Sequence, residues 1–410
     1  MKTLLTAKWV APMDQPMIRD GGVVFEAGRI LGLGTSKDLR ARHPDAQVED
    51  AGECVMLPGL VNAHVHLELS DQRAEERWTG TFVEWLGERI RSRAQLSPAQ
   101  LPAAIEAATT AGVEQCLRFG VTTVGDITRF TEITRRVLDA SGLGGVSFGE
   151  VIAMGKRAAA GAAMIEAALD QRYVRDRLAA GVAPHAPYTV NATHYRKCLE
   201  ISAARHTPIT THLAESPDER EFLADHSGPL RELWDSLGSW EEGMEPFRDG
   251  PIRFVERIGL LGVPAVLAHV NYGDNAELDI LARGQASVVY CPRTHAYFGH
   301  PPHRWREMLA RGINVAVGTD SRTSSPDLNL VDDLRLLHRI APEVPPAELW
   351  SMASIRGARA LGQTHRVGAL SASKSADVSI FPVKTPDPLA EVLENDMLPN
   401  QVWVGGRRRG

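Results

Sequence analysis

Short apolar runs, each followed by a polar tip and a helix-like stretch, recur through the middle of the chain. Eight of these runs have the near-continuous apolar character of parallel strands that are covered on both faces. They span residues 56–66, 120–126, 145–151, 180–185, 207–213, 264–270, 286–291 and 313–320. Stretches rich in Ala, Leu, Glu and Arg, such as 101–120 and 191–206, lie between them. This alternation predicts an α/β fold, a (β/α)8 TIM barrel.

The two ends of the chain have a different pattern. Before residue 59, short β-type runs are broken by Gly and Pro, and strand-like runs return at 366–372, 376–383 and 401–409. Isolated short strands cannot bury a face alone, so one shared small β-domain is more economical than two separate flaps. We expect residues 1–58 and 366–410 to form this composite domain. The catalytic barrel is expected at 59–365, with an insertion over its mouth at about 215–262.

The composition excludes several classes of protein. The net charge is −6, and Lys and Arg are scattered along the chain, which argues against a nucleic-acid partner. No run of 18 apolar residues predicts a membrane span, and the first residues lack the apolar core of a signal peptide. The four cysteines form no C-x-x-C pair, so we expect a reducing, cytoplasmic setting. We expect a small-molecule substrate, and neither a nucleic-acid nor a membrane partner.

Residues that carry chemistry stand at the ends of the predicted strands, where barrel enzymes build their active sites. In chain order, they are His64, His66, Asp126, Glu150, His185, His212, His269, Cys291, Arg293 and Asp320. A barrel with a purely structural role would need none of them there. The sequence therefore predicts a reactive centre at this end of the barrel.

The stretch "NAHVHLELS" places two histidines and a glutamate at alternate positions. Alternate residues of a strand point to the same side, so His64, His66 and Glu68 are expected to share one face. Taken alone, the pattern also fits hydrogen-bonded or solvated histidines. Together with His212 and Asp320, it offers three imidazoles and a carboxylate. This set suits Zn²⁺, with Fe²⁺ as a competitor, and leaves room for a bound water.

Glu215 lies just beyond the fifth predicted strand, in "THLAES". From there its carboxylate can reach the water without binding the metal, and it can carry a proton to a ring nitrogen and then to a leaving amine. A solvated loop glutamate is the alternative. His295, His300 and His303 follow the seventh strand, and we expect them to be exposed loop residues, with a contact to substrate as the alternative.

The stretches "GLVNAHVHLE", "THLAES", "LAHVN" and "VAVGTDS", in this order, resemble the amidohydrolase superfamily, specifically its mononuclear aminohydrolase (deaminase) branch. The resemblance covers nearly the whole chain. It implies a barrel with a small β-sandwich made from both termini, and one divalent metal ion per chain. His64, His66, His212 and Asp320 would be the metal ligands. A homodimer is a family expectation.

The resemblance also implies catalytic roles. Glu215 would be the proton shuttle, His269 would hydrogen-bond the attacking water or the intermediate, and Asp320 would receive the proton of the water. The implied reaction is hydrolytic attack at a C=N carbon that bears an exocyclic amine, followed by loss of ammonia.

Substrate contacts are expected from four further residues: Glu68, Glu150, His185 and Arg293. His185 resembles the substrate-contacting histidine of relatives that deaminate adenosine-type and guanine-type rings. The two glutamates would accept from amino or sugar hydroxyl groups. Arg293 would pair with a substrate carboxylate, although a structural salt bridge fits it equally well.

The stretch "CPRTHAYFGHPP" departs from the CP-x-S-N pattern of the S-adenosylhomocysteine, methylthioadenosine and guanine deaminases. With "HLELS", it is most similar to the branch that deaminates aminodeoxyfutalosine, a purine nucleoside that bears a benzoate. A 5′-substituted adenosine is the wider expectation.

Three other functions stay open. Binuclear relatives that open cyclic amides or imidazolones usually carry a carboxylated lysine after the fourth strand, where this chain reads "GVAPHAP". Triazine chlorohydrolases, similar in fold, often lack the shuttle glutamate. A non-enzymatic barrel scaffold typically loses metal ligands, whereas this chain keeps all four candidates.

Overall fold

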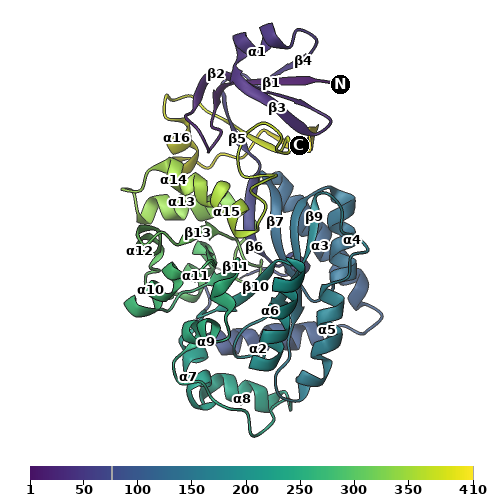
Figure 1. The fold of residues 1–410 in the computed structure, drawn as a ribbon, viewed down its shortest axis with the longest axis vertical. Coiled ribbons are helices and arrows are strands. Elements are labelled where there is room, and N and C mark those ends of the chain that lie inside the picture. The colour runs from purple at the N-terminus through teal and green to yellow at the C-terminus, as the bar shows by residue number, and fades with distance from the viewer. Residues whose placement is uncertain (75–76, 410) are drawn as a thin grey trace.

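The computed structural model describes residues 1–74 and 77–409. The predicted barrel range includes residues 75–76, and the predicted small domain ends at Gly410; these three residues lie outside the described part. The chain forms two sheets. The smaller assembly, with both chain ends, lies at the top of Figure 1, and the barrel lies below it.

The lower sheet consists of eight strands, and every neighbouring pair is parallel. In chain order, its strands are β6 (Leu60–Val65), β7 (Val121–Thr128), β8 (Gly144–Val151), β9 (Leu178–Pro184), β10 (Ile209–Leu213), β11 (Ala265–His269), β12 (Ser287–Tyr290) and β13 (Asn314–Val317). A parallel bridge between Val65 and Asp320 joins the first strand to the end of the last. The sheet therefore closes, and the predicted (β/α)8 barrel is confirmed.

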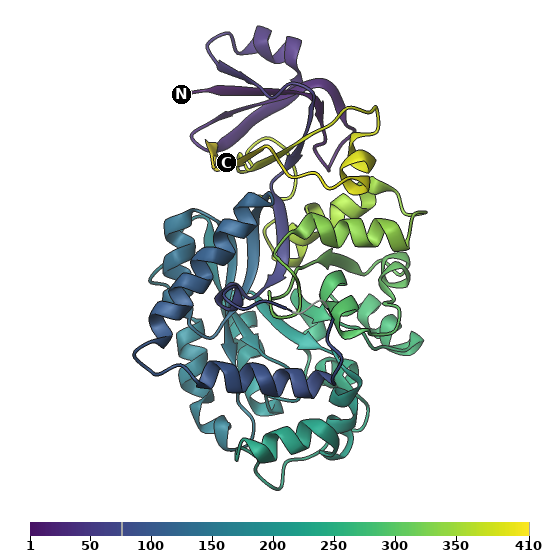
Figure 2. The ribbon, with the colours of Figure 1, turned by 180° about the vertical axis from the view of Figure 1, so that it is seen from behind.

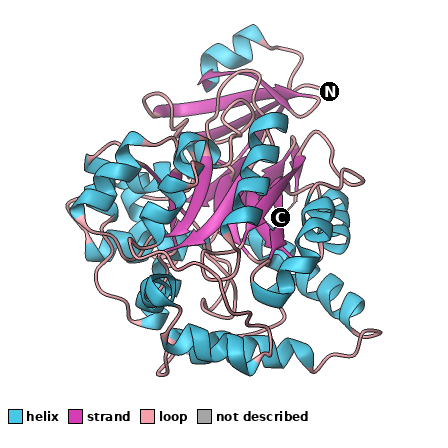
Figure 3. Cartoon of the chain, turned by 60° about the horizontal axis from the view of Figure 1, so that its bottom comes forward, coloured by secondary structure: helices cyan, strands magenta, loops and turns pink. Residues whose placement is uncertain are grey.

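Burial explains why the strand sequences are apolar throughout. Every residue of β6 and of β7 is buried, because helices cover the outside and side chains fill the inside. The strands lie centrally among the helices in Figure 3. The helices that follow barrel strands include α3 (Leu101–Arg118), α4 (Thr131–Ser141), α5 (Gly161–Ala168), α6 (Ala192–Arg205), α10 (Asn275–Arg283), α11 (Pro292–Phe298), α12 (Trp305–Ala310), α13 (Leu330–Ile340), α14 (Pro346–Met352) and α15 (Ile355–Ala360).

The two chain ends share the second sheet, as predicted. It contains β1 (Thr3–Val10), β2 (Ile18–Glu26), β3 (Arg29–Thr35), β4 (Gln47–Asp50), β5 (Cys54–Pro58), β14 (Val378–Pro382), β15 (Gln401–Val404) and β16 (Arg407–Arg408). The antiparallel pair β5–β14 joins the N-terminal to the C-terminal strands. Helices α1 (Ser36–Arg42) and α16 (Pro388–Glu394) accompany these strands.

Three local predictions are wrong. The run 56–66 is two strands rather than one, because Pro58 ends β5 in the small sheet and Leu60 begins β6 in the barrel. The run 366–372 forms turns instead of a strand, since Gly368 has a φ of 89°. Glu68 does not extend the first barrel strand; it lies in the 3₁₀ turn η1 (Leu67–Leu69).

A group of helices, called the roof helices below, covers the barrel end that lies away from the small sheet. The segment between β10 and β11 holds α7 (Pro217–Asp225), α8 (Gly228–Ser236) and α9 (Pro251–Arg257), within the range predicted as an insertion. Helix α2 (Phe82–Ala94) crosses below the strands in Figure 2. An apolar cluster that includes Phe82 and Trp234 joins α2 to α8. Within the described residues, no helix is long and apolar enough to cross a membrane.

The substitution Gly145→Ala tests the close approach of two barrel strands. Gly145 in β8 has a φ of 137°, and an added Cβ would lie 1.9 Å from Val124 O in β7. We expect the free energy of unfolding to fall by about 1–3 kcal/mol, because neither backbone can yield without breaking the ladder. Denaturant titration measures the change. Gly32→Ala in β3 is the matched control, since nothing lies within 4 Å of its added Cβ; equal losses in both variants would contradict the prediction.

Candidate metal centre

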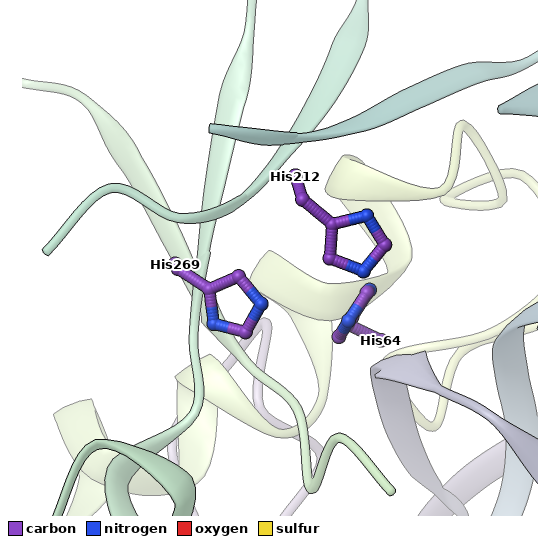
Figure 4. A group of neighbouring side chains, drawn as sticks. All are labelled: His64, His212 and His269. Atoms are coloured by element: carbon purple, nitrogen blue, oxygen red, sulfur yellow. The ribbon is translucent and has the colours of Figure 1, made fainter. Parts of the chain in front are cut away.

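The four predicted metal ligands converge at the carboxyl ends of the barrel strands. His64 belongs to β6, His66 directly follows it, His212 belongs to β10, and Asp320 follows β13. The distance between the Nε2 atoms of His66 and His212 is 3.3 Å, and Asp320 Oδ1 lies 3.6 Å from His66 Nε2 and 3.7 Å from His64 Nε2. His64, His212 and His269 approach one another from three strands in Figure 4.

Neighbouring groups determine which ligand atoms face this centre. His212 Nδ1 donates to His185 O at 3.0 Å, so Nε2 of His212 keeps its lone pair for the centre. Ser324 Oγ donates to Asp320 Oδ2 at 3.1 Å and leaves Oδ1 toward the imidazoles. These are the outer hydrogen bonds that orient metal ligands in known sites.

The residues fit a bound divalent ion. Both ring nitrogens of His64 are buried without a hydrogen-bond partner, which is costly unless another group satisfies them. Zn²⁺ binds His nitrogen at about 2.0–2.1 Å in tetrahedral sites, which places pairs of ligands about 3.4 Å apart. The observed spacings of 3.3–3.7 Å are close to this value.

Burial keeps the imidazoles neutral, as metal ligation requires. Desolvation lowers the pKa of His64 and of His66 well below the ordinary value, and lowers that of His212 to about 4. The pKa of Asp320 is raised to about 6 by burial, against the hydrogen bond from Ser324. A cation at the centre would favour the carboxylate form of Asp320.

The backbone is strained around this centre. Ala214, His269, Val270 and Asp320, all at or just beyond strand ends, have φ values of 50°, 71°, 52° and 56°. Non-glycine residues adopt such angles only where the surrounding structure enforces them, and such strain is concentrated at functional sites. Two of these strained residues, His269 and Asp320, line the pocket described below.

Glu215, the predicted proton shuttle, lies beside these side chains. Its Oε1 lies 3.5 Å from His269 Nε2, which has no hydrogen-bond partner. Ligand atoms of Glu215, His269 and Asp320 lie within 4.8 Å of one another. The pKa of Glu215 is raised well above its ordinary value by burial, and further by the charges of Asp320 and Glu219. A carboxyl group with a raised pKa is suited to both accept and donate a proton near neutral pH.

A pocket of about 440 Å³ opens onto these residues, within the size range of small-molecule sites. His66, His212, Glu215, His269 and Asp320 line its inner end. Its outer part is lined largely by apolar and aromatic side chains of the roof helices, including Phe82, Trp85, Leu230, Leu233 and Trp234.

Three of the four predicted substrate contacts line this pocket: Glu68, Glu150 and His185. His185 Nδ1 lies 2.7 Å from Thr189 Oγ1, and its Nε2 lies 3.9 Å from Glu150 Oε1. The Glu68 carboxylate accepts hydrogen bonds from Thr128 Oγ1 and from the backbone N–H of Arg129. Burial raises the pKa of Glu68 to about 7.

Arg293 does not line the pocket, and the structure contradicts its predicted contact with substrate. Its Nε donates to Asp333 at 3.0 Å and its Nη1 to Asp327 at 2.7 Å, while Nη2 donates to the carbonyl oxygens of Asp327 and Asn329. No guanidinium nitrogen is left for a ligand. The salt bridge considered as the alternative is the arrangement observed.

The variant Arg293→Met is therefore expected to affect stability rather than substrate affinity. Asp333 is fully buried, and loss of its cation would lower the free energy of unfolding by about 3 kcal/mol. KM should stay unchanged. Arg306→Met is the control, because its exposed ion pair with Glu343 contributes about 0–1 kcal/mol. A raised KM with wild-type stability in Arg293→Met would restore the substrate-binding role.

The expectation of exposed loop histidines after the seventh strand is also wrong. His295 and His303 are buried, and His303 Nε2 donates to His269 O at 2.9 Å while its ring stacks on Tyr290. Arg129 and Arg157 also line the pocket, and neither was predicted from the sequence. Arg129 follows Thr128, the last residue of β7, so its position just beyond a barrel strand was the signal available.

A model described as the amidohydrolase family matches residues 55–409. The chain belongs to this family. The predicted assignment to it, as an enzyme that hydrolyses carbon–nitrogen bonds, is confirmed. A second model, the imidazolonepropionase-like composite domain of bacteria, matches residues 21–46 in the small sheet.

Relatives of this amidohydrolase are named as deaminases. It is 27% identical to 5-methylthioadenosine/S-adenosylhomocysteine deaminase of Moorella thermoacetica over 98% of this chain and 90% of the relative. It is 29% identical to aminodeoxyfutalosine deaminase of Deinococcus radiodurans over 83% of this chain and 81% of the relative. The solved structure of Helicobacter pylori aminofutalosine deaminase with methylthio-coformycin has the same fold, with a TM-score of 0.85, 22% identity and complete coverage of both chains.

Proposed function

We propose that this chain is a metal-dependent hydrolytic deaminase. It attacks a C=N carbon that bears an exocyclic amine, on a purine-type nucleoside or related heterocycle, and releases ammonia. The observation that carries the proposal is the Glu215 carboxyl group, 3.5 Å from His269 Nε2 and close to Asp320, beside an imidazole–carboxylate cluster of metal-binding geometry.

One divalent ion per chain would be held by His64, His66, His212 and Asp320. When bound, such an ion supplies a coordinated water whose pKa is lowered to about 7. Zn²⁺ is the first expectation from the ligand set, and Fe²⁺ is the alternative.

The side chains of the chain would move the protons. Asp320 takes a proton from the attacking water, since a bound cation would keep its carboxyl group ionised and able to accept one. Glu215 delivers its proton to the ring nitrogen, takes up the proton that Asp320 removed from the water, and passes it to the leaving amine. As the C–N bond breaks and the C=O bond forms, the hydroxyl proton of the adduct returns to Glu215. His269, whose Nε2 points at Glu215, hydrogen-bonds the water or the adduct. His185 contacts the heterocycle from the neighbouring strand end.

The pocket supports a substrate larger than a bare heterocycle. Its apolar outer part extends beyond the reactive end to Phe82 and Trp234, and Arg129 and Arg157 provide positive charge along the wall. Aminodeoxyfutalosine or another 5′-substituted adenosine would place its heterocycle at the centre and its substituent against this wall. The relatives named above support this substrate class. The cytoplasmic location and the homodimer stay predictions.

The test is an ammonia-release screen of the metal-loaded protein against adenosine, 5′-substituted adenosines, aminodeoxyfutalosine, guanine and cytosine. We expect turnover of a purine nucleoside with a 5′ substituent. Ring opening of a cyclic amide without ammonia, or chloride release from a triazine, with no deamination, would replace the proposal with the corresponding hydrolase.

A further inference from the structure

Glu219 is a fully buried carboxyl group that has no part in the proposed reaction. It lies in the first turn of α7, one helical turn after Glu215. Its Oε2 accepts a hydrogen bond from Glu215 N at 3.1 Å. Because Glu219 does not line the pocket, its contact with the site runs through the main chain of Glu215.

A second buried side chain, that of Asn271, bonds to the main-chain carbonyl group of Glu215. Asn271 Nδ2 donates to Glu215 O at 3.0 Å. Both main-chain polar groups of Glu215 are therefore bound by side chains rather than by a sheet ladder. The residue before it, Ala214, has a φ of 50°, a strained angle that persists only where neighbouring contacts enforce it.

Helix α7 is capped differently from α2 and α10, although all three have a glutamate as their third residue. In α2 and α10, the third helical residue, Glu84 or Glu277, accepts from the backbone N–H of the capping residue, which accepts a bond in return. Glu219 is the third residue of α7, yet it reaches past the capping residue Ser216 to Glu215 N. The Ser216 side chain makes no capping bond, and its Oγ is buried without a partner.

The arrangement costs stability that ordinary capping would not. Oε1 of Glu219 is buried without a hydrogen-bond partner, and burial raises the pKa of this carboxyl group to about 8. A buried carboxyl group with an unpaired oxygen lowers the stability of the fold. The group that it contacts is the backbone of the shuttle.

We infer that Glu219 is a positioning residue, which together with Asn271 fixes the main chain of Glu215 so that the shuttle carboxyl group stays beside His269. The inference rests on the proposed deaminase function. Displacement of a reacting group by about 1 Å lowers turnover by up to about 100-fold, so the effect is expected in kcat rather than in KM.

Two variants separate the hydrogen bond from other effects. Glu219→Met keeps the approximate volume but has no acceptor, and we expect kcat to fall about 10- to 100-fold with KM and metal content near wild type. Glu219→Gln keeps an acceptor oxygen, so its kcat should stay within about 3-fold of wild type. The control is Glu277→Met, which removes another buried glutamate from the same helical position in α10, outside the pocket lining; it should lower stability and leave kcat unchanged.

A double-mutant cycle gives the decisive comparison. If Glu219 acts through the shuttle, Glu215→Gln/Glu219→Met is no slower than Glu215→Gln alone; additive losses would overturn the inference. Wild-type kcat in Glu219→Met, or equal impairment of Glu219→Gln and Glu219→Met, would also overturn it. Should Glu219→Met lose its metal or fail to fold, Asn271→Ala replaces it, with the same expected loss of kcat and with wild-type kcat as the contrary result. Absence of ammonia release from every compound by the wild-type protein would instead refute the proposed function.

Discussion

Exchange of Glu215 for glutamine is expected to lower kcat by about 10²- to 10⁴-fold while the protein keeps its metal. Glutamine has the same shape and remains beside His269, but it cannot take up and release a proton at this pH. The loss corresponds to about 3–5 kcal/mol of transition-state stabilisation. Steady-state ammonia release, together with metal analysis of the same preparation, measures both quantities.

The control for this variant is Glu200→Gln, on an exposed position of α6, which should have wild-type kcat and metal content. Normal turnover of the true substrate by metal-loaded Glu215→Gln would remove the shuttle from the mechanism. A variant that is inactive because its metal is lost would instead place Glu215 among the ligands.

Removal of the metal is expected to abolish ammonia release altogether. The imidazoles of His64, His66 and His212 are neutral, so without the ion they place no positive charge at the centre that could lower the pKa of a water molecule. Dialysis against a chelator should give inactive protein, and return of Zn²⁺ or Fe²⁺ should restore activity at one ion per chain. Asp320→Asn should weaken retention of the ion, because a neutral amide replaces a charged ligand.

Elemental analysis and assay on the same samples decide this prediction. Two bridged ions per active chain would contradict the mononuclear site, and undiminished activity in metal-free protein would contradict the metal mechanism as a whole. The relative recovery with Zn²⁺ and with Fe²⁺ identifies the ion that the site uses.

The fold could be predicted from the sequence because its strands are buried on both faces, which leaves a continuous apolar run at each strand. Because parallel strands end on the same side of the barrel, the sequence also predicted that His64, His212 and Asp320 meet there, although they are far apart in the chain. The apolar pattern does not show where the chain leaves one sheet and enters another. Residues 54–61 are largely apolar, yet the chain bends at Gly59 from one sheet into another, and an added Cβ there would lie 2.2 Å from Thr122 Oγ1.

The partners of individual side chains were beyond the reach of the sequence. Arg293 follows a barrel strand as the reactive residues do, but its acids, Asp327 and Asp333, come from a later segment. Local pattern cannot reveal that pairing, nor that His303 supports His269 from a loop. The same holds for Glu219, since a glutamate at the third position of a helix reads as an ordinary cap.

The antiparallel pair between Cys54–Pro58 and Val378–Pro382 has a consequence for synthesis of the protein. On the ribosome, β5 presents an open, apolar strand edge until nearly the entire chain has been translated, and such edges recruit other chains. Contacts of this sequence separation form slowly. Ribosomes stalled before residue 378 should therefore carry nascent chains that bind chaperones or aggregate. This tendency should end once β14 has emerged from the ribosome and paired with β5.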